Sequence, residues 1–193
     1  MKLSTTQEPL TLMDMNDTQL VELARQGNQD AFSCLYDRYL PKIYKKVWFK
    51  IPAEYVEDVT HEIFIRVIRS LDTFRGESQF STWLWTLSQR QIADFYRSKQ
   101  WKNVNAELEQ EAVGDFENYF FSTDSPDIDT SIMLRQAMHK LPEHYQEIIL
   151  LRFVEGYKFH EIAKLTGKKL EATKSLYRRA IAELKLAFGA WNE

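Results

Sequence analysis

The segment that decides the fold reads FHEIAKLTGKKLEATKS and covers residues 159–175. Ala163 is small enough to let two helices cross closely, and Gly167, four residues later, can adopt the left-handed conformation that ends a helix. We expect Leu170 to seat the following helix in the core. These spacings are typical of a helix-turn-helix, whose second helix can enter the major groove of DNA.

The second helix of this motif carries a polar and basic surface, formed by Lys174, Ser175, Arg178 and Arg179. Residues at the front of such a helix can reach base edges, and the remaining cations can hold phosphates. Taken alone, the motif could also be an ordinary helical hairpin with a solvated basic face. The preceding stretch favours DNA binding, because a helix that starts at Pro142 and ends at Gly156 leads directly into the motif.

The rest of the chain shows the same helical periodicity. Apolar residues recur at helical spacing and no run is typical of a strand, so the sequence predicts an all-α protein. We expect Asp17 to cap a first short helix and Asn28 to cap a second. A third helix is expected after Pro52, and a fourth near Ser78, following a turn at Arg75-Gly76.

Residues 103–130 interrupt the pattern with eight Asp and Glu and no Lys or Arg. The net charge of −3 therefore divides into +1 for residues 1–102, −8 for this segment and +4 for residues 131–193. We expect an acidic flexible linker that joins two small helical domains, residues 15–102 and 131–193. Its aromatic residues could dock transiently or form a short packed helix: Phe116, Tyr119, Phe120 and Phe121.

A second motif lies in the N-terminal half, in the strings DVTHEIFIRV (58–67), FRGESQFSTWL (74–84) and DFYR (94–97). Together with residues 131–188, these strings resemble the extracytoplasmic-function (ECF, group 4) sigma factors of the sigma-70 family, which direct bacterial RNA polymerase to promoters. The resemblance implies that the N-terminal domain is region 2, which binds core polymerase and the −10 element. The C-terminal domain would be region 4, which recognises the −35 element.

The resemblance assigns contact with the β′ clamp helices of polymerase to Asp58, His61 and Glu62. Helical geometry agrees, since these three positions share one face, opposite Val59 and Ile63. The alternative for the acidic residues is that they complement the helix macrodipole, and neither explanation excludes the other.

The resemblance also implies that the loop from Asp72 to Phe80 captures a base flipped out of the −10 element, while the next helix lines the melted strand. Base capture requires a pocket, stacking surfaces and cations. We expect Trp83 and Trp85 in the core, because they continue an apolar stripe. The candidates for −10 contacts are Phe74, Arg75, Glu77, Ser78, Gln79, Arg90 and Arg97.

Two departures from the family pattern affect these expectations. Arg90 stands where many relatives have Asn, so the −10 base preference is not carried over. In the helix-turn-helix, Thr173 and Tyr177 replace the usual aliphatic residues, and Thr adds a hydroxyl to a Val-like shape.

The implied partners are core RNA polymerase, through its β′ clamp helices and β flap, promoter DNA, and a cognate anti-sigma factor that is often membrane-tethered. The linker suits binding to two DNA elements, since 28 residues reach about 90 Å when extended and B-DNA rises about 34 Å per turn. The sequence has no signal peptide and no apolar run of membrane-spanning length, so we expect a cytosolic protein without membrane insertion of its own.

The sequence indicates no enzyme, no cofactor and no metal site. His61-Glu62 begins like a zinc-protease pattern, but Ile65 occupies the position of the required second His. Cys34 has no visible His or Asp framework around it. The main alternative is a free-standing helix-turn-helix transcription regulator, which shares residues 159–188 but leaves residues 58–97 unexplained.

Overall fold

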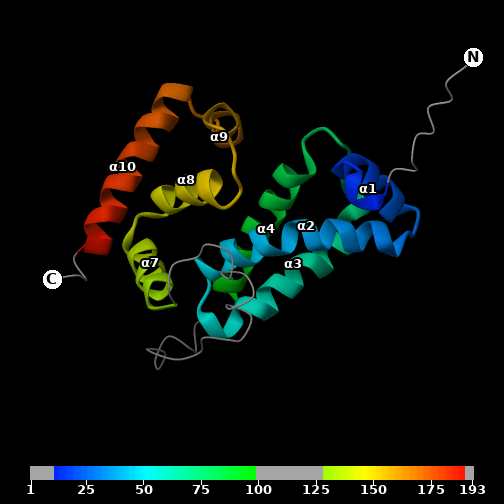
Figure 1. Cartoon of the computed structure of the whole chain (residues 1–193), viewed down its shortest axis with the longest axis horizontal. Helices are drawn as coiled ribbons and strands as arrows, with labels where there is room; N and C mark the ends of the chain where they lie inside the picture. Colours follow the sequence, from blue (N-terminus) through cyan, green and yellow to red (C-terminus); the bar gives the residue numbers. More distant parts are fainter. Residues whose placement is uncertain (1–10, 99–127, 190–193) are drawn as a thin grey trace, which may run out of the picture.

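The computed structural model describes residues 11–98 and 128–189 of the 193-residue chain. Every regular element in these two ranges is a helix, which confirms the all-α prediction (Figure 1). We call residues 11–98 the N-terminal module and residues 128–189 the C-terminal module. No helix within the described ranges combines the length and apolarity needed to cross a bilayer. The expected linker lies mostly outside them, although the first C-terminal helix already begins at Ile128.

The N-terminal module contains four α-helices, with short 3-10 helices before the first, between the second and third, and between the third and fourth. Its elements are η1 (Leu12–Asp14), α1 (Asp17–Arg25), α2 (Gln29–Trp48), η2 (Ala53–Tyr55), α3 (Val56–Ser70), η3 (Leu71–Thr73) and α4 (Phe80–Arg97). Asn28 caps α2 as expected, because its side chain accepts a hydrogen bond from the Ala31 N–H at 3.0 Å. The prediction that Asp17 caps α1 is wrong.

Asn16 caps α1 instead, in a reciprocal pair with Gln19 in which both hydrogen bonds measure 3.0 Å. Asp17 is the first residue of the helix, and its carboxylate accepts hydrogen bonds from Arg38, at 2.6 Å, and from Tyr39. Asp17 therefore links α1 to α2, because its carboxylate bonds to side chains of the neighbouring helix rather than to the backbone at the start of its own helix.

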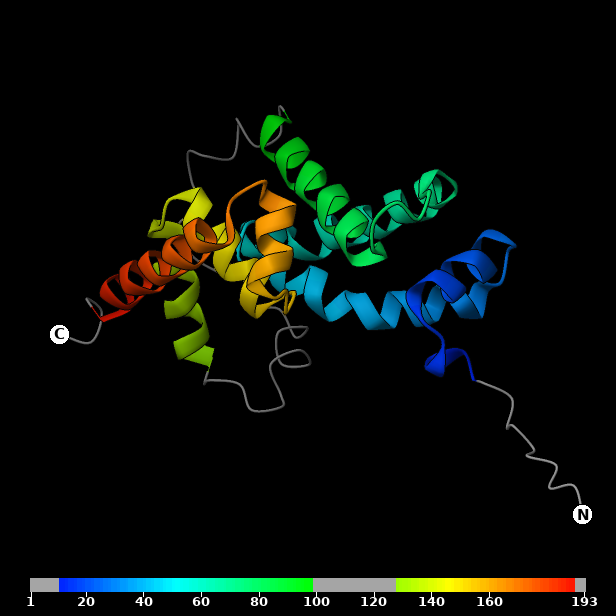
Figure 2. The same cartoon turned by 90° about the horizontal axis from the view of Figure 1, so that it is seen from above.

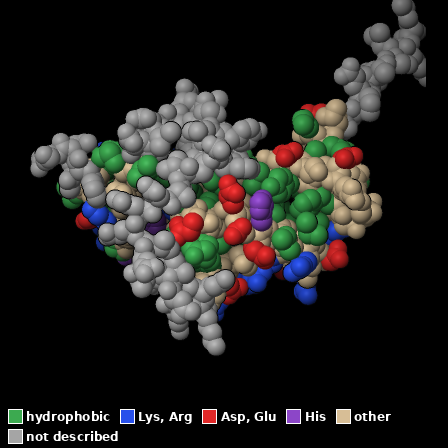
Figure 3. Space-filling view, turned by 90° about the horizontal axis from the view of Figure 1, so that it is seen from below, with side chains coloured by type: hydrophobic (Ala, Val, Ile, Leu, Met, Phe, Trp, Pro, Cys, Tyr) green, Lys and Arg blue, Asp and Glu red, His purple; other side chains and the backbone are tan. Residues whose placement is uncertain are grey.

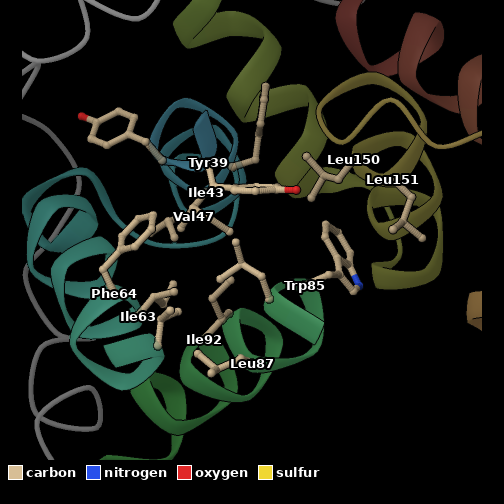
Figure 4. Packing of buried hydrophobic residues seen from close by; sticks show 14 of the residues in the cluster. Tyr39, Ile43, Val47, Ile63, Phe64, Trp85, Leu87, Ile92, Leu150 and Leu151 are labelled. Carbon is tan, nitrogen blue, oxygen red and sulfur yellow. The ribbon is translucent and has the colours of Figure 1, made fainter. Parts of the chain in front are cut away.

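The core of the N-terminal module is the apolar face of α3, which packs against α2 and α4. The α3 stripe, in which Val56, Val59, Ile63 and Val67 recur at helical spacing, is buried throughout, as are facing residues of α2 and α4. Figure 4 shows several of these side chains pointing toward one another: Ile43, Val47, Ile63, Phe64, Leu87 and Ile92. Trp85 is also buried in the core, as expected.

The C-terminal module comprises α7 (Ile128–Lys140), α8 (Glu143–Phe153), α9 (Phe159–Thr166) and α10 (Leu170–Gly189). Pro142 precedes the first residue of α8 as predicted, where its missing N–H leaves no hydrogen bond unmade. Gly156 follows α8 with φ +76°, in the left-handed region that glycine adopts without a steric penalty. The chain then turns into α9, so that α10 packs against α7, α8 and α9.

The ribbons of the two modules lie next to each other in both views (Figures 1 and 2). Their buried apolar residues form one continuous core. Leu150 and Leu151 of α8 are buried close to Tyr39 and Trp85 of the N-terminal module (Figure 4). At the edge of this contact Arg135 of α7 donates a hydrogen bond to the carbonyl of Ile51, and its guanidinium lies 4.9 Å from the ring centroid of Trp48. The modules therefore pack together in this conformation.

Lys46 of α2 is fully buried within the same contact. Its ammonium donates to the Trp85 carbonyl at 3.0 Å and to the Ser88 hydroxyl at 2.6 Å, and lies 3.2 Å from the centroid of the Trp85 ring. Burial lowers the pKa of Lys46 well below its usual value, and the carboxylate of Glu155 in the C-terminal module opposes that change.

Candidate nucleic-acid interface

The turn of the helix-turn-helix is built as the sequence predicts. Gly167 ends α9 with φ +66°, and Ala163 is buried where the helices meet. The expectation for Leu170 is wrong, because this residue is 39% exposed at the start of α10. Thr173, one turn later, occupies the fully buried position, and its hydroxyl donates to the Lys169 carbonyl at 3.1 Å. The helix thus keeps a hydroxyl inside without leaving it unpaired.

The opposite face of α10 presents the predicted basic surface. Arg178 and Arg179 are exposed, and Lys174 and Ser175 are half-buried near the start of the helix. Lys174 donates to the Glu171 carboxylate at 2.8 Å, and this hydrogen bond lowers the pKa of Glu171. All four predicted residues lie on the side of α10 away from the buried Thr173, as expected from helical geometry.

A shallow hollow of about 390 Å³ lies beside this surface, where the start of α10 meets the start of α8. Its lining includes His144, Lys168, Lys169 and Arg179. Lys168 and Lys169 follow Gly167 directly, and the paired lysines at a helix start are the sequence signal that could have identified them as binding residues. The hollow gathers three cations, which suits phosphate contacts.

The loop between η3 and α4 carries the second predicted site. Arg75, Glu77, Ser78 and Gln79 are all exposed on it, and Gly76 turns the chain with φ +72°. Phe74 differs, because it is 5% exposed and its ring packs against Phe80 and Trp83 at centroid distances of 5.7 and 5.5 Å. This corrects its assignment as a base contact: the ring anchors the loop in the core and offers no face for stacking.

Beside the loop, a hollow of about 430 Å³ is lined by residues of α3, the loop and α4. The predicted residues Ser78 and Arg90 both line it, together with Arg66, Thr82 and Trp83. The structure thus brings a polar loop residue, two cations and part of an aromatic ring into one concave surface. Such a combination can accept an unstacked base and its phosphate.

Arg97 lies outside the lining of that hollow, on the last turn of α4, and forms an ion pair with Asp94. Asp94 also pairs with Arg66 of α3 at 3.0 Å. The Arg66 hydrogen bond and the neighbouring positive charges lower the pKa of Asp94. Asp94 therefore holds two cations in place along this side of α4.

The loop also borders the C-terminal module. A third hollow, of about 440 Å³, lies between Glu77, Ser78 and Gln79 of the loop and residues of α9, including His160 and Lys164. Tyr157, just before α9, is buried beside the hydroxyl groups of Ser81 and Thr82, without a well-aligned hydrogen bond to either. The loop is therefore close to α9 in this conformation.

The predicted polymerase-binding residues lie on the exposed face of α3. Asp58, His61 and Glu62 are solvent-exposed, whereas Val59 and Ile63 on the opposite face are buried. Figure 3, which views the molecule from below, shows acidic side chains clustered around a histidine on the N-terminal module. With respect to the residues that the structure describes, this face is therefore exposed to solvent. Among the residues that the structure describes, no group of three or more His, Cys, Asp or Glu is arranged to hold a metal ion.

Two family models match this chain, one largely within each module. The family model Sigma-70 region 2 matches residues 35–102, and Sigma-70, region 4 matches residues 131–184. These ranges contain the loop and the α3 face in one case and the helix-turn-helix in the other.

Several curated relatives match most of the chain. The ECF RNA polymerase sigma-E factor of Haemophilus influenzae is 30% identical over 176 residues, which span 86% of this chain and 92% of the relative. Its Escherichia coli K12 counterpart is 30% identical over 173 residues, spanning 86% and 91%. The ECF RNA polymerase sigma factor BldN of Streptomyces coelicolor is 30% identical over 168 residues, covering 86% of this chain and 63% of BldN.

Solved structures share the fold. CnrH, in complex with the cytosolic domain of CnrY, superposes with a TM-score of 0.61 at 24% identity, covering 90% of this chain and 97% of that chain. The sigma factor RpoE in complex with the anti-sigma factor NepR from Bartonella quintana gives 0.63 at 18% identity, covering 82% and 96%. From the two family matches and the relatives aligned over nearly their whole length, the chain belongs to the ECF RNA polymerase sigma factors of the sigma-70 family.

Proposed function

We propose that this sigma factor, of group 4, recruits core RNA polymerase through the α3 face and recognises promoter DNA through two separate surfaces. Asp58, His61 and Glu62 would contact the β′ clamp helices, and the C-terminal module would bind the β flap. Strand opening is then driven by binding energy rather than by catalysis, and the protein acts in the cytoplasm without a cofactor.

The observation that carries this proposal is the basic face of α10. Lys174 and Ser175 near the front of the helix would contact base edges of the −35 element. Arg178 and Arg179 would hold phosphates, joined by Lys168 and Lys169 in the adjacent hollow. The buried Thr173 on the other side of the helix leaves this face available.

The loop hollow supports the second DNA contact. An unpaired −10 base would enter between Ser78 and Arg90, while Arg75, Glu77 and Gln79 at the exposed loop complete the rim. Arg97 would hold the backbone of the melted strand further along α4. Phe74 contributes by anchoring the loop from within the core.

Simultaneous use of both DNA surfaces requires the modules to separate. A strand entering at Glu77 to Gln79 would meet α9, because the loop and α9 line one hollow. Linked weak sites also bind DNA more tightly when a scaffold presents them together, so free sigma factor should bind promoter DNA weakly. An anti-sigma factor that keeps the modules packed or covers the α3 face would be the corresponding inhibitor.

Run-off transcription with purified core polymerase that lacks any other sigma factor tests the function. The template is a promoter that the wild-type holoenzyme selects from a randomised pool. We expect defined transcripts only when the protein is added. Binding to core polymerase without initiation at a defined start site would contradict the proposal.

A further inference from the structure

The exposed loop of residues 75–79 has little internal support. Two contacts among its own residues are a Ser78 hydroxyl contact with the Gln79 carbonyl at 3.4 Å and an Arg75–Glu77 ion pair at 4.0 Å, both exposed to solvent. Such contacts contribute little to a fixed conformation. The position of the loop must therefore be set mainly by its two ends.

The C-terminal end of the loop is fixed by aromatic packing. Phe80 begins α4, is buried, and contacts Tyr39 and Trp83 with ring centroids 5.3 and 5.6 Å apart. The N-terminal end is fixed in part by the buried ring of Phe74. Ring packing alone leaves the direction of the backbone at Phe74 open, because its carbonyl lies in an extended segment after η3.

Arg25, in the last turn of α1, fixes that backbone. Its Nε donates to the Leu71 carbonyl at 3.2 Å, and its Nη2 donates to the Phe74 carbonyl. The Leu71 carbonyl also accepts the Phe74 N–H at 3.1 Å. A guanidinium is planar and presents its donors at fixed angles, so one side chain sets the relative position of both carbonyls.

Partial burial restricts the guanidinium itself. Arg25 is half-buried, and its guanidinium lies 3.7 Å from the largely exposed Glu22 carboxylate, one turn earlier on α1. The helix is attached to α2 independently of Arg38, through its buried residues Leu20 and Val21 and through the hydrogen bond that Tyr39 donates to Asp17. Arg25 therefore connects a fixed helix to the point where the loop leaves the core.

We propose that Arg25 is a positioning residue for −10 recognition: it holds the Phe74 carbonyl so that residues 75–79 stand at the rim of the hollow containing Arg90. This inference rests on the function proposed above for the loop. Arg25 makes no DNA contact in this role, and its effect is transmitted through the backbone of residues 71–74.

The test compares Arg25→Met with Arg38→Met in holoenzyme reconstituted from the full chain and core polymerase. Arg38 is a matched control, because it also donates to backbone carbonyls of the same module, those of Met15 at 2.9 Å and Met13 at 3.3 Å, but not to the loop. Arg25→Lys, which keeps the charge and can reach one carbonyl, is the rescue variant.

Two measurements are made on the selected promoter. The first is −10 discrimination, the ratio of transcription from the selected element to transcription from its single-base variants. The second is the fluorescence of 2-aminopurine placed at the −10 position with the strongest preference, which reports unstacking directly. Affinity for core polymerase and thermal stability are recorded for every variant.

We expect Arg25→Met to reduce −10 discrimination about tenfold, the factor that corresponds to losing one charge-assisted hydrogen bond, and to reduce the fluorescence change. Arg25→Lys should recover part of the loss. Core affinity and −35 preference should stay unchanged. Arg38→Met should retain full −10 discrimination even where it lowers thermal stability as much as Arg25→Met does.

Unchanged discrimination in Arg25→Met, or an equal loss in Arg38→Met, would overturn the inference. If Arg25→Met does not fold, Arg25→Gln replaces it, since its side chain is polar but too short to reach both carbonyls, and the same comparison decides. A wild-type holoenzyme that initiates without any −10 preference would instead overturn the function proposed for the loop, and this inference with it.

Discussion

Lys46 of α2 and Glu155 of the turn after α8 interact electrostatically across the contact between the two modules. Each changes the other's pKa in the direction that favours the charged form, against the effect of burial, which lowers the pKa of Lys46 and raises that of Glu155. The Glu155 Oε1 atom is buried without a hydrogen-bond partner among the described residues, so the attraction to Lys46 partly offsets its desolvation.

This relationship predicts non-additive stability changes. Lys46→Met should lower the free energy of unfolding by about 2 kcal/mol, because it removes two buried hydrogen bonds and the larger of the two electrostatic effects, those of Lys46 and Lys42, that favour the ionised Glu155 carboxylate. Adding Glu155→Gln should return about 1 kcal/mol of this loss. Urea unfolding of the single and double variants measures both changes. The control pairs Lys46→Met with Glu183→Gln, an exposed acid of the C-terminal module, and strictly additive losses in the Glu155 pair would contradict the coupling.

Gly167 gives a second stability prediction. A Cβ at this position would meet no atom within 4 Å, so the cost of Gly167→Ala arises from the backbone, which has φ +66°. We expect a loss of about 1 kcal/mol in the free energy of unfolding. Gly167→Asn should lower the free energy of unfolding by less than Gly167→Ala does, since Asn tolerates the left-handed conformation better than Ala. Equal stability of the Ala variant and the wild type in urea unfolding would show that the turn is not constrained in this way.

Asp94 predicts a pH dependence. Its pKa is lowered in the folded state from the ordinary 3.8, so its contribution is fully present above that value and is lost as the pH falls through the lowered pKa. Because the side chain is 39% exposed, Asp94→Asn should cost about 1 kcal/mol or less at pH 7. The difference from wild type should persist at pH 5 and shrink at pH 3. Asp72→Asn, which changes an exposed acid outside this cluster, serves as the control. If the stability difference between Asp94→Asn and wild type is the same at pH 3 and pH 7, the ion pairs of Asp94 do not contribute as predicted.

Local features of the fold could be predicted from the sequence because their causes are local. The cap at Asn28 and the turn at Gly167 depend on a few adjacent residues, and the α3 stripe depends on periodicity. The prediction that Leu170 is buried is wrong, because it relies on hydrophobicity, and Leu170 is the apolar residue at the start of the helix. The fold instead turns Thr173 inward, where a hydrogen bond to the Lys169 carbonyl satisfies its hydroxyl.

Long-range features could not be predicted in this way. No periodicity rule indicates that Lys46 is fully buried, since its partner Glu155 is more than 100 residues away in the sequence. Likewise, Phe74 lies in a predicted loop, where its ring could either stack on a base or anchor the loop in the core. The packing of the ring on Phe80 shows that it anchors the loop. The sequence could not indicate the role of Arg25, because the groups it binds are backbone carbonyls, which every residue carries.

The α3 face predicts a loss of polymerase binding without a loss of stability. Asp58→Ala combined with Glu62→Ala should weaken core binding about tenfold or more, while the free energy of unfolding changes by less than about 0.5 kcal/mol, because both residues are exposed. The matched control is Glu54→Ala with Glu57→Ala, which removes the same charge near the start of the helix. If the acids serve only the macrodipole, both double variants should lose stability and neither should lose core binding.

Substitutions on the basic face of α10 should cause two distinguishable defects in DNA binding. Lys174→Ala should relax the base preference at one position of the −35 element about tenfold, because a side chain that contacts a base edge discriminates among bases. Arg179→Ala should instead weaken all −35 sequences alike and reduce the slope of log affinity against log salt by about one, as expected for one lost phosphate contact. Holoenzyme binding to a series of −35 variants at several salt concentrations separates the two. Lys185→Ala, an exposed lysine near the other end of α10, is the control, and the assignment fails if this variant loses as much as the other two.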